Sequence, residues 1–127
     1  MHKSVDYFFG EVEYSVEERR RVSFPVLYTK ILEKIDKEYK ELGVYISEIC
    51  NSHLRCFPQS YKEKQIGKYL KRPLDNKERI AFFASTLYLL DSKNRLLLPG
   101  RFGGLEKVLF VGNGDVLDIW DPKGFKR

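Results

Sequence analysis

Two short stretches of this sequence place a carboxylate four residues before an arginine. Glu17 precedes Arg21, and Asp91 precedes Arg95. In both stretches a mostly apolar run follows and ends in proline four residues after the arginine, and the two copies are offset by 74 residues. A guanidinium at such a turn can reach phosphates or the O6 and N7 atoms of guanine. The pattern indicates a repeated turn that either contacts a nucleic acid or is a solvated loop closed by its own ion pair.

The basic residues beside the two turns favour the first copy for such contacts. Glu18 is followed by three consecutive arginines, whereas the second turn carries one lysine and an arginine that Asp91 can hold in place. We expect DNA contacts from Arg21, Arg19, Arg20, Arg95 and Lys93. We expect Glu17 and Asp91 to shape these two turns, which we call the first tip (Glu17 to Arg21) and the second tip (Asp91 to Arg95).

A second set of candidate residues has the spacing Cys-x-x-His-x-x-Cys. Cys50, His53 and Cys56 could ligate a metal in a small nuclease or another metal-dependent enzyme. However, no fourth ligand stands nearby, and strand alternation would not aim all three side chains to one side. The alternative is that the two cysteines are small apolar strand residues beside a turn. Since no catalytic triad or glycine-rich phosphate loop occurs either, we predict no enzyme, no metal, no cofactor and no small-molecule substrate.

Length and charge set the frame for these motifs. The 127 residues suffice for one compact domain, or for two halves that share a core. The net charge is +5, and residues 62–79 hold seven basic and three acidic residues, so most of the excess lies there. No apolar run is long enough to span a membrane, and Met1–Asp6 lacks the apolar core of a signal peptide, so a cytoplasmic protein is expected.

Alternating apolar and polar residues predict strands around both arginine motifs. In the first half we expect a hairpin over 7–24, a helix over 25–43, and a second hairpin of 44–49 with 53–57. In the second half we expect a hairpin of 87–90 with 95–98, a glycine-rich segment over 102–105, and a hairpin of 108–111 with 116–120.

The segment between the halves has helical signals. Ser60 and Glu63 form a possible capping box for a helix that ends near Pro73, and a second helix begins near Asp75-Asn76. The apolar residues expected to face inward are Ile66, Tyr69, Leu70, Ile80, Phe83 and Leu87. The prediction is an α+β fold with about three helices and internal pseudo-twofold symmetry, divided into a first half (1–61), a basic helical connector (62–85) and a second half (86–127).

Three stretches, taken in order, resemble a known family. Phe8-Phe9-Gly10 is followed by the first turn, which ends at Pro25; the second turn runs from Asp91 to Pro99; and Val111 to Asp121 forms a closing hairpin. This order resembles the MraZ family, whose halves are each related to the SpoVT/AbrB-type swapped-hairpin DNA-binding fold. The resemblance implies duplicated β-hairpin barrel halves.

The same resemblance implies a function. It suggests a nucleoid-associated transcriptional regulator of the bacterial division and cell-wall gene cluster. Such a regulator binds short direct repeats in double-stranded promoter DNA as a ring-shaped homo-oligomer. Arg21 would be the main contact and Arg95 its counterpart. The alternative is an antitoxin-like or scaffolding oligomer that binds another protein and has only incidental DNA affinity.

The sequence departs from the family at the first tip. Glu17 replaces an aspartate, and Arg20 and Asn94 stand where the family has glycine. Asparagine tolerates positive φ, whereas an arginine there costs about 1 kcal/mol. We therefore expect the first tip to adopt a different turn.

Overall fold

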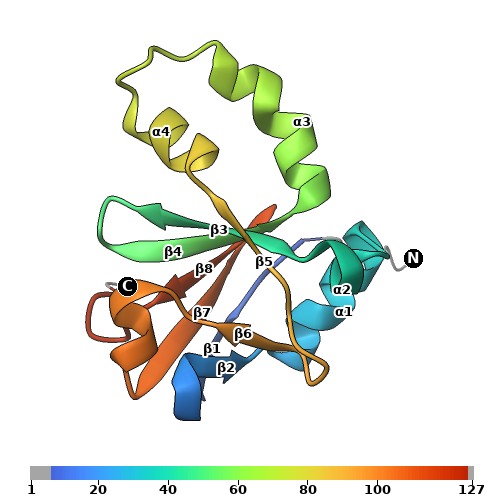
Figure 1. The fold of residues 1–127 in the computed structure, drawn as a ribbon, viewed down its shortest axis with the longest axis vertical. Helices are drawn as coiled ribbons and strands as arrows, with labels where there is room; N and C mark the ends of the chain where they lie inside the picture. The colour runs from blue at the N-terminus through green and yellow to red at the C-terminus, as the bar shows by residue number, and fades with distance from the viewer. Residues whose placement is uncertain (1–6, 126–127) are drawn as a thin grey trace.

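The computed structural model describes residues 7–125 and confirms the α+β class (Figure 1). The strands are β1 (Glu11–Ser15), β2 (Arg21–Ser23), β3 (Val44–Ile49), β4 (His53–Pro58), β5 (Thr86–Tyr88), β6 (Arg95–Leu97), β7 (Lys107–Asn113) and β8 (Val116–Trp120). The helices are α1 (Val26–Ile35), α2 (Tyr39–Leu42), α3 (Gln59–Leu70) and α4 (Lys77–Phe83), with 3-10 turns η1 (Glu18–Arg20) and η2 (Gly100–Gly104). Six strands form one sheet in the order β1-β7-β8-β4-β3-β5, and β2 pairs with β6 in a separate ribbon.

The strand pairings have an internal symmetry. If β1 to β4 are exchanged with β5 to β8 in order, the pair β1–β7 becomes β5–β3 and the hairpin β3–β4 becomes β7–β8. The pairs β2–β6 and β4–β8 map onto themselves. Each half therefore supplies a strand, a tip, a second strand and a closing hairpin in the same order.

The two closing hairpins are confirmed, but the two hairpins predicted at the arginine motifs are wrong. β1 runs along β7, and β5 runs along β3. β2 and β6 leave their own tips and pair with each other, Val22 lying opposite Leu96. The reason is burial: both of these side chains are fully buried, which a three-residue strand folded back on its own solvent-exposed neighbour would not achieve.

The predicted helix over 25–43 is two helices. α1 ends at Ile35, and the Asp36 carboxylate then accepts a hydrogen bond from the Glu38 N–H, a local turn that competes with helix. The predicted end at Gly43 is confirmed. Gly43 has φ 77°, and an added Cβ would lie 2.5 Å from the Tyr88 carbonyl oxygen, so β5 crosses it closely.

The connector differs from its prediction in the residue at which its first helix begins and in the side chains that its helices bury. α3 begins at Gln59, one residue before Ser60, and its N-cap makes no side-chain hydrogen bond, so the predicted capping box is wrong. Asn76 does cap α4, its side chain accepting from the Arg79 N–H at 2.9 Å. None of the helices within residues 7–125 is long and apolar enough to cross a membrane.

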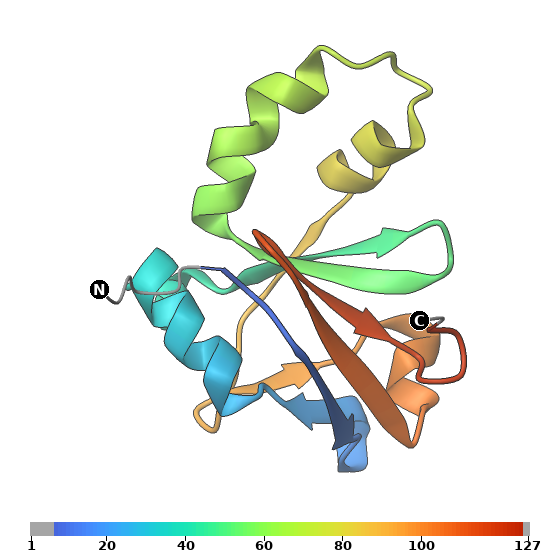
Figure 2. The ribbon, with the colours of Figure 1, turned by 180° about the vertical axis from the view of Figure 1, so that it is seen from behind.

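The core has two parts. The larger lies between the sheet, the ribbon and α1, and it includes Phe24 packed edge-on against Phe110. The smaller joins the connector to the sheet through Tyr69 and Phe82, whose rings stack at 4.3 Å, together with Phe57 and Val116. Figure 2 shows α3 and α4 standing away from the sheet, at the end of the molecule opposite the ribbon.

This arrangement corrects the predicted inward face of the connector. Of the six apolar side chains expected to point inward, Tyr69 is buried, and five are exposed: Ile66, Leu70, Ile80, Phe83 and Leu87. Because the two helices rise from the sheet and do not lie across it, only the helical side chains nearest the small core are covered. Leu87 is not on the second helix as predicted, since α4 ends at Phe83 and Leu87 lies on β5.

Candidate nucleic-acid interface

The ribbon of β2 and β6 brings the two arginine motifs onto one surface. The register pairs Arg21 with Leu97 and Ser23 with Arg95 across the ribbon. Val22 and Leu96 point into the core, so strand alternation turns the other four side chains outward. We call these four residues, Arg21, Ser23, Arg95 and Leu97, the outer ribbon face. Two arginines that are 74 residues apart in sequence are thereby joined in one site.

The two tips share backbone hydrogen bonds and differ in the contacts of their carboxylates. The N–H of Glu17 donates to the Arg21 carbonyl at 2.7 Å, and the N–H of Asp91 donates to the Arg95 carbonyl at 3.1 Å. Asp91 also accepts from the N–H groups of Lys93 and Arg95, an Asx-type turn. Glu17 is one methylene longer and instead accepts from the Ser23 hydroxyl at 3.0 Å.

The backbone of the first tip is more strained than that of the second. Asn94 alone has positive φ in the second tip, at 56°, whereas Arg19 and Arg20 in the first have φ 62° and 65°. Arg20 thus takes the positive φ that glycine would favour, as Asn94 does at the matching position, and the first tip differs from the second by the additional positive φ of Arg19. Such strain persists only where the surroundings hold it.

The carboxylates link the two copies. Asp91 Oδ2 lies 2.7 Å from Arg95 Nε and 3.6 Å from Arg21 Nε, and Glu17 Oε1 lies 3.6 Å from Arg95 Nη1. Among the ion pairs of residues 7–125, Glu17 therefore pairs with the arginine of the other tip. The alternative of a loop closed by its own ion pair therefore fits the second tip, where Asp91 pairs with Arg95, but not the first, where Glu17 and Arg21 each pair with a side chain of the other tip.

The electrostatics leave the two arginines available for a ligand. Desolvation raises the pKa of Asp91, but the N–H groups of Arg95 and Lys93 and the Arg95 guanidinium outweigh it, so that its pKa lies below the ordinary value. Asp91 is thus ionised at neutral pH and orients Arg21 and Arg95. Each guanidinium has five N–H donors, and these contacts occupy only part of them.

The remaining predicted contact residues lie at the tips in different settings. Arg19 and Lys93 are exposed. Arg20 donates to the Gly100 carbonyl in η2, and a Cβ added to Gly103 would lie 2.3 Å from Arg20 Nε. η2 thus supports the first tip, a role that was not predicted from the sequence. The glycines at 100, 103 and 104 were the available signal, since glycine often marks a close approach.

The basic connector is partly committed to internal contacts. Arg72 pairs with Glu78 at 2.8 Å, and Arg79 donates to the carbonyls of Leu70 and Arg72. The Lys62 ammonium donates to a serine hydroxyl and lies 4.0 Å from the centre of an aromatic ring. The charge that is prominent in the sequence therefore serves the packing of α3 and α4 at these three positions.

The Cys-x-x-His-x-x-Cys residues do not converge. Cys50 is exposed and Cys56 is buried, and burial raises the pKa of the Cys56 thiol. His53 stacks on Trp120 at 4.1 Å, and its Nδ1 lies 2.7 Å from the Ser52 hydroxyl. No group of three or more His, Cys, Asp or Glu side chains between residues 7 and 125 is placed to hold a metal ion.

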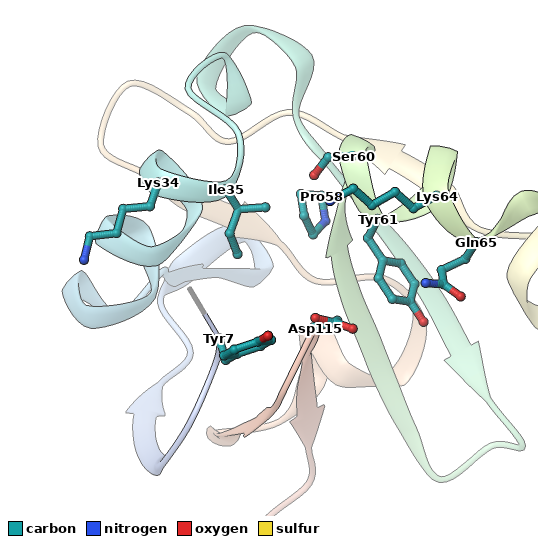
Figure 3. Close-up of a pocket in the computed structure, with 9 residues that line it drawn as sticks. All are labelled: Tyr7, Lys34, Ile35, Pro58, Ser60, Tyr61, Lys64, Gln65 and Asp115. Atoms are coloured by element: carbon teal, nitrogen blue, oxygen red, sulfur yellow. The ribbon is translucent and has the colours of Figure 1, made fainter. Parts of the chain in front are cut away.

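A cavity of about 430 Å³ lies beside the start of α3 (Figure 3). Tyr7, Tyr61 and Asp115 stand around it, while the ammonium of Lys34 points away from them. Because a carboxylate lines this cavity and the Lys34 ammonium is turned away, it does not assemble a binding set for an anionic ligand.

No family model matches the sequence. Curated relatives match nearly all of it, and each is called transcriptional regulator MraZ. The protein of Rickettsia bellii is 30% identical, over 91% of this chain and 81% of its own. That of Ruegeria sp. (strain TM1040) is 27% identical, over 94% and 80%. That of Mycoplasmoides gallisepticum is 21% identical, over 94% and 85%.

Proposed function

Because the chain belongs to the MraZ family of transcriptional regulators, we propose that it binds double-stranded promoter DNA sequence-specifically through the outer ribbon face. MraZ regulators are not enzymes, as the sequence predicted for this chain. The observation that carries the proposal is the pairing of β2 with β6, which puts Arg21 and Arg95 side by side on an outward surface. A two-stranded ribbon fits the major groove, which is about 12 Å wide.

Each predicted contact residue has a part in this proposal. Arg21 makes the main base contact and Arg95 its counterpart, with their guanidinium groups aligned by Asp91 and Glu17. Arg19 and Lys93, exposed at the tips, contact phosphates, which fix the position of the ribbon without reading sequence. Arg20 contributes by holding the first tip on η2. A direct contact of Arg20 with DNA stays a prediction.

We further propose that residues 1–61 and 86–127 are copies of one swapped-hairpin unit, joined by the connector 62–85. The exchange of strand pairings between the halves and the 74-residue offset of the motifs support this. Residues 1–6 and 126–127, at the outer ends of the two units, lie outside the described residues.

The proposed working form is a ring-shaped homo-oligomer. The connector exposes large apolar side chains, and exposed apolar patches mark protein interfaces. These side chains are Ile66, Leu70, Leu74, Ile80 and Phe83. A ring would set several ribbons along direct repeats in the promoter of the division and cell-wall genes, in a cytoplasmic, nucleoid-associated protein. Its subunit number can be measured by light scattering.

The test of DNA binding compares two duplexes. Labelled DNA from upstream of the protein's own gene cluster and a scrambled duplex are titrated at two salt concentrations. We expect tighter binding to the first, with affinity falling steeply as salt rises because counterions are released. Arg21→Ala should weaken specific binding roughly tenfold or more, since one arginine-to-guanine contact contributes about 1–3 kcal/mol.

The matched control is Lys71→Ala, which removes one exposed positive charge from the connector. It should affect both duplexes alike and only slightly. Circular dichroism should show that both variants stay folded. Unchanged specific binding by Arg21→Ala would remove Arg21 from the site, and equal binding of the wild type to both duplexes would overturn the proposal.

The exposed connector also favours a second candidate, an antitoxin-like or scaffolding role. Its apolar side chains would fit a different protein as well as a second copy. One stoichiometric protein partner in a pull-down, combined with no preference among DNA sequences, would establish this role in place of the first.

A further inference from the structure

Leu97 is the one apolar residue of the outer ribbon face. It is 42% exposed, while its neighbours Leu96 and Leu98 are buried in the core. Strand alternation therefore separates Leu97 from the apolar run to which it belongs in the sequence. It lies directly across the ribbon from Arg21. On the surface proposed to meet DNA, this leucine has contact chemistry of its own.

We infer that Leu97 is a specificity-determining residue that contacts the C5-methyl group of a thymine beside the base pair bound by Arg21. This inference rests on the proposed function. In the major groove, thymine alone among the four bases presents an apolar group, and the others present hydrogen-bond donors and acceptors. A leucine placed against those groups would desolvate them without pairing them, which costs affinity. Leu97 thus favours thymine and disfavours the other bases.

The spacing of the ribbon supports this assignment. Residues opposite each other in an antiparallel pair have Cβ atoms about 4.5–5.5 Å apart. Successive bases along one DNA strand are about 3.4 Å apart. Arg21 and Leu97 therefore reach neighbouring base pairs. The second register pair, Ser23 and Arg95, lies two residues along the strands, or about 6.6 Å away.

Leu97 also breaks the symmetry of the ribbon. Exchanging the halves places Arg21 on Arg95, but it places Ser23 on Leu97. The arginines are equivalent, whereas one end of the face carries a hydroxyl held by Glu17 and the other carries an apolar side chain. The two ends thus differ in chemistry, and each ribbon has a direction on the DNA. A directed contact surface fits direct repeats better than palindromes.

The experiment replaces thymine by deoxyuridine, which lacks only the methyl group. The shortest upstream duplex that binds the full chain is resynthesised with one replacement at a time, and Kd is measured for each by fluorescence anisotropy. We expect the wild type to lose roughly fourfold at one thymine, corresponding to about 0.8 kcal/mol for one buried methyl-sized group. Leu97→Ala should bind the thymine duplex more weakly and should bind both duplexes equally at that position.

Leu27→Ala is the matched control, because Leu27 is 45% exposed, close to the exposure of Leu97, and lies on α1, outside both the outer ribbon face and the apolar side chains of the connector. This control variant should lose as much affinity as the wild type does when thymine is replaced by deoxyuridine. Equal binding of thymine and deoxyuridine by the wild type at every position would overturn the inference. So would a Leu97→Ala variant that keeps the sensitivity, or one whose mass in solution changes, since Leu97 would then be a subunit contact.

The failure of the proposed function is distinguishable from these outcomes. In that case the wild type would show no preference between the upstream and scrambled duplexes before any thymine is replaced. If the preference exists and the methyl effect does not, the DNA-binding proposal stands and Leu97 has no part in it.

Discussion

Whether η2 supports the first tip can be tested by replacing Gly103 with alanine, which adds one methyl group. In Gly103→Ala, the added Cβ would lie 2.3 Å from Arg20 Nε and 2.9 Å from Arg20 Cβ. The φ of Gly103 lies outside the left-handed region, so the alanine backbone itself is tolerated. The second contact involves an atom next to the backbone, so rotation of the end of the arginine side chain cannot relieve it. The substitution must push Arg20 away from η2.

The expected cost follows from what Arg20 loses. Its hydrogen bond to the Gly100 carbonyl is made by a charged donor, for which about 1.5–3 kcal/mol is typical, and its exposure favours the lower value. Replacing a glycine with alanine also lowers the conformational entropy of the unfolded chain, which stabilises the folded protein by about 0.4–1 kcal/mol. The free energy of unfolding should therefore fall by about 1 kcal/mol. For a domain of this size, the melting temperature should fall by about 4 °C.

The larger effect is expected on DNA binding. Arg19 and Arg20 both have positive φ, and the Arg20 carbonyl also accepts a hydrogen bond from the Leu98 N–H at 2.8 Å, so both the backbone and the side chain of Arg20 hold the first tip in place. Displacing the side chain shifts the backbone beside it, and Arg21 at the start of β2 moves with it. We expect specific affinity to fall roughly tenfold, or about 1.4 kcal/mol.

Gly104→Ala is the control, because an added Cβ there meets no heavy atom within 4 Å. Thermal unfolding and anisotropy are measured for both variants, and again in an Arg20→Gly background. There the clash is gone, so Gly103→Ala should cost little. If Gly103→Ala behaves like Gly104→Ala, or costs as much without the Arg20 side chain, the reasoning is refuted.

Two further predictions concern the buried side chains of β4. Desolvation lowers the pKa of His53, with Asp118 opposing and Arg55 reinforcing the shift, so the unfolded chain takes up its proton first as pH falls. The free energy of unfolding in urea should therefore decrease from pH 7.5 to 5.5, and His53→Gln should reduce that slope; an equal slope in the variant would contradict this. Because burial raises the pKa of the Cys56 thiol while Cys50 is exposed, a disulfide reagent should label one thiol quickly in the native protein and two after denaturation. Fast labelling of a Cys50→Ser variant would show that Cys56 is reactive.

The parts of the fold that the sequence predicted are those whose partners are neighbours in the chain. The hairpin β7–β8 is closed by Gly112 to Asp115, and β3–β4 turns at Asn51-Ser52, so the turn residues themselves identify the pairing. The α4 cap at Asn76 is equally local. Periodicity shows which face of a strand is buried, but it does not say which strand lies beside it, and for that reason β1, β2, β5 and β6 were paired incorrectly.

The residues of the candidate site were identified from the sequence, but not their assembly. Types and spacing were enough to select Arg21 and Arg95, because arginine beside a turn suits phosphate and guanine contacts. Nothing local showed that Arg21 takes its carboxylate partner from the other tip. The contact of Arg20 with η2 was hidden for the same reason, since 80 residues separate Arg20 from Gly100.

The repeat itself held the missing information. A unit that cannot bury its own apolar side needs a second copy to complete its core. Each arginine motif here is followed by a strand of only three residues, and a two-stranded hairpin alone is marginal in water. Two such strands at one offset in one small chain are therefore best paired with each other. Because that pairing buries Val22 against Leu96, it also forces both arginines outward, so the core contact that completes the fold is the one that assembles the site.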